Sequence, residues 1–80
     1  MHLASYRTVA HAERGWTQLH HAYGGLLGSL QHEVDKVHLG SKGTYYRLKA
    51  GPLKSMAAAK ALCAELKAKR QFCQPSLMGG

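Results

Sequence analysis

The side chains of this chain that could bind a metal or take part in catalysis are six histidines, two cysteines and four carboxylates. Zinc ligands usually come in pairs separated by a few residues, or one helical turn apart. Cys63 and Cys73 are too far apart for such a pair, and a helix would point the adjacent His20 and His21 about 100° apart. The sequence therefore predicts no metal site and no cofactor.

The same residues give little support for catalysis. The carboxylates, Glu13, Glu33, Asp35 and Glu65, show no pairing pattern of a glycoside hydrolase. Cys63 falls on the inner stripe of a predicted helix, where a thiol is a poor nucleophile. We therefore predict a binding module and not an enzyme. The cysteines themselves are compatible with one disulfide or with two buried thiols.

Composition sets the size and the charge of this module. Eighty residues, 45% of them apolar, allow one small domain with one modest core. A net charge of +7 is compatible with a merely solvated basic surface, or with attraction to nucleic acid, an anionic lipid surface or a cell-wall polymer. The chain shows no signal peptide and no apolar run long enough to cross a membrane.

The first half of the chain predicts a strand and then a helix. Residues 2–7 form a short segment in which apolar and polar residues roughly alternate, as in a strand. Thr8 is suited to cap the helix that follows. Glycines at 24, 25 and 28 weaken the last turns of this helix. Its apolar stripe consists of Ala12, Trp16, Leu19, Tyr23, Leu26, Leu27 and Leu30.

A hairpin is expected next. Residues 34–39 predict a strand with Val37 and Leu39 on its inner face, residues 40–43 have turn chemistry, and residues 44–50 predict the clearest strand of the chain. In this strand Tyr46, Leu48 and Ala50 share one face, and Tyr45, Arg47 and Lys49 share the other.

The second half ends in a helix and a short strand. Gly51 and Pro52 interrupt the preceding strand, and Ser55 is suited to cap an alanine-rich helix. A last strand is expected around residues 71–73. The inner stripe of the helix is Ala59, Leu62, Cys63 and Leu66, with Lys60, Lys67 and Lys69 facing water.

The element order is β-α-β-β-α-β, which predicts an α+β, ferredoxin-like fold: a four-stranded antiparallel sheet with two helices on one face. The other face would then be open and would suit an extended polar polymer. The residues expected on this open face are His2, Ala4, Tyr6, Lys36, His38, Tyr45, Arg47 and Lys49.

Two segments resemble the signatures of SPOR domains. Residues 2–6, HLASY, are similar to the first-strand pattern of that family, and residues 45–53, YYRLKAGPL, are similar to its Arg-x-x-x-Gly-Pro signature. A Ser-led, alanine-rich helix follows, as it does in the family. The resemblance implies a module that binds peptidoglycan, in particular glycan strands stripped of their stem peptides, and that collects at the division septum.

The resemblance also implies a site. Ser5, Tyr45 and Arg47 match family positions, whereas His2 replaces the usual Gln and Ala4 the usual Gly. We expect arginine and lysine to pair with the lactyl carboxylates of muramic acid, and tyrosines to stack on sugar faces. The expected ligand-binding set is His2, Ser5, Tyr6, Tyr45, Arg47 and Lys49. Because such domains are exported, the resemblance implies a Cys63–Cys73 disulfide.

The resulting hypothesis is one domain over residues 1–78, excised from a larger envelope protein. It is expected to act in the periplasm as a monomer, with peptidoglycan as its partner, without nucleic acid, and with no membrane contact of its own. The main alternative is an RNA-binding module of the same fold, although the third strand lacks the Gly-aromatic-Gly-aromatic pattern of those proteins. Another alternative is a dimerisation domain that uses the open face.

Overall fold

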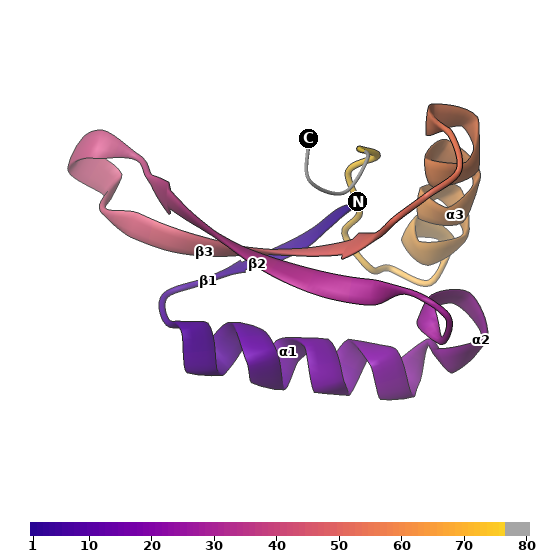
Figure 1. Ribbon diagram of the computed structural model, residues 1–80, viewed down its shortest axis with the longest axis horizontal. Helices are drawn as coiled ribbons and strands as arrows, with labels where there is room; N and C mark the ends of the chain where they lie inside the picture. Colours follow the sequence, from indigo (N-terminus) through magenta and orange to yellow (C-terminus); the bar gives the residue numbers. More distant parts are fainter. Residues whose placement is uncertain (77–80) are drawn as a thin grey trace.

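The computed structural model describes residues 1–76, which form an α+β domain with a three-stranded antiparallel sheet of order β1-β3-β2 (Figure 1). The strands are β1 (His2–Tyr6), β2 (Gln31–His38) and β3 (Thr44–Gly51), and the helices are α1 (Val9–Ala22), α2 (Gly24–Leu27) and α3 (Met56–Ala68). The predicted turn is a 3₁₀ helix, Gly40–Lys42, with positive φ at its first residue, Gly40, and at Gly43, which follows it.

Both long helices begin where their capping residues predict. The Thr8 hydroxyl accepts from the His11 amide at 3.0 Å, and the Ser55 hydroxyl accepts from the Ala58 amide at 3.1 Å. Each cap satisfies one of the amides that a first helical turn leaves without a partner.

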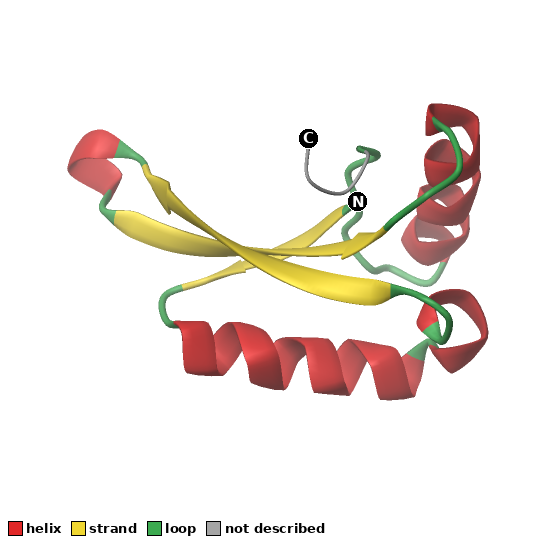
Figure 2. Cartoon of the chain, in the orientation of Figure 1, coloured by secondary structure: helices red, strands yellow, loops and turns green. Residues whose placement is uncertain are grey.

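The predicted four-stranded sheet with two helices on one face is not confirmed. Helix α1 runs along one face, whereas α3 stands at the end of the sheet, next to α2 (Figures 1 and 2). The apolar stripe predicted as one helix is divided in two, because Tyr23 (φ −119°, ψ 41°) leaves the helical region between α1 and α2. This break lets Leu27 turn into the core, where it is fully buried.

The core lies at the end of the sheet nearest α3. It joins residues from both ends of the chain and from α2, β3 and α3: Met1, Leu3, Leu27, Ala50, Ala59, Cys63, Leu66 and Cys73. The inner stripe predicted for α3 is therefore confirmed at Ala59, Cys63 and Leu66. The exposed lysines of that helix lie on its other side, also as predicted.

The predicted fourth strand at residues 71–73 is not formed in the described chain. A single antiparallel bridge joins Gln74 to His2, with amide-to-carbonyl distances of 2.9 and 3.0 Å. A bulge in β1 lies between His2 and Ala4, and there the Gln71 side-chain nitrogen donates to the Leu3 carbonyl at 3.1 Å. A side chain thus occupies an acceptor that a regular strand would pair through its main chain.

Candidate functional site

Strand register gathers one set of side chains on the face of the sheet away from α1. Lys49 lies opposite His2 on one neighbouring strand and Glu33 on the other, and Arg47 lies between Ser5 and Asp35. Directly opposed residues share a face of a sheet. The open face therefore contains His2, Ser5, Glu33, Asp35, Val37, Tyr45, Arg47 and Lys49.

The predicted placement of Ala4 and Tyr6 on this face is wrong. The bulge between His2 and Ala4 pairs Ala4 with Leu48 and Tyr6 with Tyr46, which puts both on the side of α1. A Cβ atom on Gly15 of α1 would collide with the Tyr6 hydroxyl, so the glycine makes room for this ring. A bulge reverses the side of every later residue in the strand, and β1 alone gave no sign of one.

The predicted outer face of β2 is also reversed. Lys36 lies opposite Tyr46 and His38 opposite Thr44, on the side of α1, whereas Val37 lies opposite Tyr45. The strand begins at Gln31, earlier than predicted, and Val34 takes the core-facing position opposite Leu48.

His32, like Val34, lies on the side of β2 that faces α1. Its ring stacks on Trp16 of α1, with 5.1 Å between ring centroids and 16° between planes. Its Nε2 lies 2.6 Å from the Glu13 carboxylate. These contacts with α1 hold the even-numbered positions of β2 against the helix.

A hollow of about 150 Å³ opens on the face at the β1 edge, lined by His2, Arg47, Lys49, Gln74, Pro75 and Ser76. His2 is fixed here, because its Nε2 lies 3.1 Å from the Ala4 carbonyl and 3.2 Å from the Ser5 hydroxyl oxygen. Burial lowers the pKa of His2, and the Ala4 carbonyl partly opposes this effect. The neutral imidazole is thus favoured in the wall of the hollow.

The two cations of the hollow differ in their partners. Lys49 Nζ lies 2.7 Å from a carboxylate oxygen of Asp35, and the lysine side chain is only 15% exposed. This hydrogen bond holds the pKa of Asp35 below its usual range. Among residues 1–76, ion pairs form only here and at His32–Glu13, so Arg47 takes part in neither. The sequence reasoning missed Asp35, because it assigned the even-numbered residues of β2 to the open face.

Tyr45 lies near the start of β3, and Arg7 partly covers its ring. The Arg7 guanidinium lies 4.6 Å from the centroid of its ring, within range of a cation–π contact. The sequence reasoning did not include Arg7. Its position two residues after Ser5 was the available signal, since alternate residues of an extended chain share a face.

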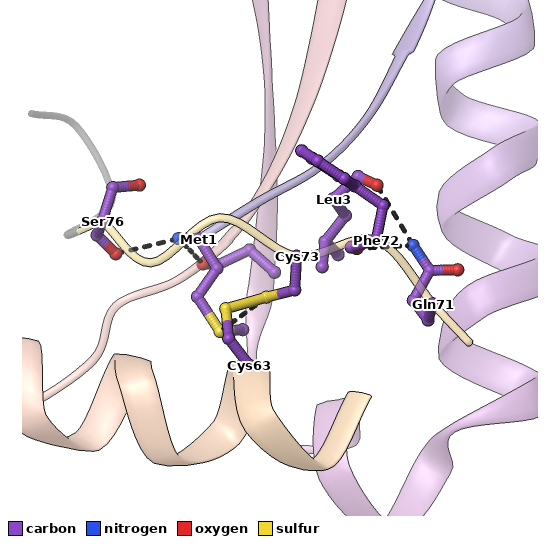
Figure 3. The surroundings of a disulfide bond; sticks show 8 residues. Met1, Leu3, Cys63, Gln71, Phe72, Cys73 and Ser76 are labelled. Atoms are coloured by element: carbon purple, nitrogen blue, oxygen red, sulfur yellow. Dashed lines mark hydrogen bonds between the residues drawn. A yellow bond between two sulfur atoms is a disulfide. The ribbon is translucent and has the colours of Figure 1, made fainter. Parts of the chain in front are cut away.

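The segment after α3 lines part of the hollow, and Figure 3 shows its attachment to Cys63 and Met1. A disulfide joins Cys63 of α3 to Cys73, whose Cα atoms are 5.2 Å apart, and the Met1 sulfur lies 3.8 Å from Cys73 Sγ. The Ser76 carbonyl accepts from the Met1 nitrogen at 3.0 Å. Both ends of this segment are therefore attached to the rest of the domain.

Comparison with protein-family models decides the family. The SPOR domain model matches residues 1–78, essentially the whole chain. The chain belongs to the SPOR domain family. SPOR domains are peptidoglycan-binding modules of bacterial cell-envelope proteins, and the family is one of binding and not catalysis. No curated protein and no solved structure gives a match.

Two further properties concern the described residues of this SPOR domain. Over residues 1–76, none of the helices combines the length and the apolar character that crossing a membrane requires. The same residues contain no cluster of three or more histidine, cysteine or carboxylate side chains that would hold a metal ion.

Proposed function

We propose that this SPOR domain binds glycan strands stripped of stem peptides on the open face of its sheet, and so brings its parent protein to the cell wall at the division septum. The single observation that carries the proposal is the hollow that brings His2 and Arg47 together, on a face that Ser5 also shares. A periplasmic location and a monomeric state belong to the same proposal. The bridge at Gln74 lies beside β1, the place of a fourth strand in a ferredoxin-like sheet, and we assign the domain to that fold.

Arg47 is the residue proposed to choose the ligand. A glycan without stem peptides exposes lactyl carboxylates, and a guanidinium pairs with a carboxylate through two parallel hydrogen bonds. Asp35 stands directly across from Arg47, but Lys49 already pairs with it. Lys49 thereby supports the site by neutralising the nearest competing carboxylate.

Neutral parts of the site are suited to sugar hydroxyls and N-acetyl groups. The Ser5 hydroxyl and the His2 imidazole both donate and accept hydrogen bonds. Tyr45 is proposed as a minor contact, since Arg7 lies over its ring, and Tyr6 is not part of the proposed site because it faces α1.

The test is sedimentation of the 80-residue chain with purified sacculi, before and after amidase treatment to remove stem peptides. We expect binding to increase after treatment, and Arg47→Ala to weaken it roughly ten- to hundredfold, as for loss of a charged hydrogen-bonded pair. Arg14→Ala is the matched control, since Arg14 is an exposed arginine on α1.

Two results would contradict the proposal. Equal losses with Arg47→Ala and Arg14→Ala would indicate attraction by net charge alone. A failure to sediment with either preparation, combined with salt-sensitive binding to single-stranded RNA, would favour the RNA-binding alternative. Circular dichroism of each variant separates loss of binding from loss of fold.

A further inference from the structure

Phe72 is an exposed aromatic residue next to the hollow. The residue is 57% exposed, and its ring meets the His2 ring edge to face, with 5.5 Å between centroids and 78° between planes. Single exposed apolar residues are ordinary on protein surfaces. Phe72 differs from such a residue because it touches a residue that lines the hollow.

The main chain around Phe72 is held on both sides. The Gln71 side-chain nitrogen donates to the Phe72 carbonyl at 2.8 Å and to the Leu3 carbonyl at 3.1 Å (Figure 3). Cys73 is fixed by its disulfide, and Gln74 exchanges two main-chain hydrogen bonds with His2. The aromatic ring therefore stands on a fixed backbone, which lowers the entropy lost when a ligand packs on it.

Exposed and buried residues alternate along residues 72–74, which places the Phe72 ring on the side of the open face. Cys73 is buried in the core, whereas Phe72 and Gln74 are exposed. Gln74 lines the hollow together with His2 and Arg47. In an extended segment Phe72 and Gln74 share a side, so Phe72 extends the open face beyond the β1 edge.

We infer that Phe72 is the aromatic platform of the glycan site and stacks on a sugar ring next to the one whose carboxylate pairs with Arg47. This inference rests on the proposed function. A pyranose ring presents a face of C–H groups that packs on the negative face of an aromatic ring, and phenylalanine has only two side-chain torsions to restrict. Tyr45 is less suited to this role, because the Arg7 cation already occupies a face of its ring.

The chain offers an exact probe, since Phe72 is its single phenylalanine. Incorporation of 4-fluorophenylalanine gives one ¹⁹F resonance, and we expect it to shift on titration with glycan strands stripped of stem peptides. Phe72→Ala and Phe72→Leu are each expected to weaken binding roughly three- to tenfold, whereas Phe72→Trp retains it. Val9→Ala, which trims an exposed apolar residue of α1, is expected to change nothing.

The outcomes separate this inference from the proposed function. If Arg47→Ala abolishes binding while Phe72→Ala binds like wild type and the ¹⁹F resonance stays in place, the glycan site stands and the platform role of Phe72 is overturned. Retention of binding by Phe72→Leu would also overturn it, because leucine keeps the apolar contact and removes the ring. If the wild-type chain does not bind glycan, the proposed function and this inference fail together. Thermal melts confirm the fold of each variant.

Discussion

The two edges of the binding face are attached to the domain in different ways. On one edge, every residue of β2 has a main-chain partner in β3. On the other edge, one bridge at Gln74 and a side-chain hydrogen bond from Gln71 join residues 71–76 to β1, and the Cys63–Cys73 disulfide joins them to α3. A strand ladder distributes its stability over many bonds, whereas the second edge depends on a few named contacts. We therefore expect the second edge to be more sensitive than the first to the loss of one contact.

The largest loss of stability is expected from a substitution at Leu48, where β3 packs into the core. Leu48 is fully buried and lies between Ala4 and Val34 on the side of α1. Leu48→Ala should lower the free energy of unfolding by about 2–5 kcal/mol, because it removes buried apolar surface and leaves a cavity. Urea denaturation measures this loss. The same substitution at Leu39, which is 38% exposed in the hairpin turn, should cost less than about 1 kcal/mol. Similar losses at both positions would show that the hairpin is not anchored through Leu48.

Removal of the disulfide tests the second edge. The double variant Cys63→Ala, Cys73→Ala should lose about 2–3 kcal/mol, the chain-entropy value for the short loop between the cysteines. Hydrogen exchange should speed up first at the amides of Gln71 and Gln74, with a smaller change in β2 and β3. A uniform change over both edges would contradict the difference between them, and chemical reduction of the wild-type chain serves as the control.

A smaller effect is expected on how the free energy of unfolding depends on pH, because His2 titrates on the β1 edge and Asp35 on the β2 edge. Burial lowers the pKa of His2 from its ordinary value of 6.5, so the unfolded chain takes up this proton first and stability falls as the pH drops below 6.5. The hydrogen bond from Lys49 lowers the pKa of Asp35 from 3.8, so its contribution is complete above pH 3.8 and is lost as the pH falls through its folded value. Denaturation from pH 7 to pH 3 should show a first decline that His2→Gln reduces and a second that Asp35→Asn reduces. Persistence of both slopes in the variants would assign them to other groups.

Elements with local signals could be predicted from the order of amino acids. Thr8 and Ser55 cap their helices, the turn at residues 40–43 has positive φ at both glycines, and the phase of β3 is as predicted. These features depend on hydrogen bonds and torsions within a few residues, so the amino-acid types nearby are sufficient to indicate them. The family signature around Arg47 is local in the same sense.

The set of residues on the open face depends on contacts between distant parts of the chain. The bulge in β1 moved Tyr6 to the side of α1, and the contacts of His32 with Trp16 and Glu13 set the phase of β2. Neither is encoded nearby, because a strand with mixed residues on both faces is compatible with either side until a partner helix covers one. The exposure of Phe72 is also a tertiary feature, since the sequence predicted only a short strand around residues 71–73. The disulfide draws the neighbouring Cys73 into the core and the Gln71 side chain ties the segment to Leu3, which leaves Phe72 exposed.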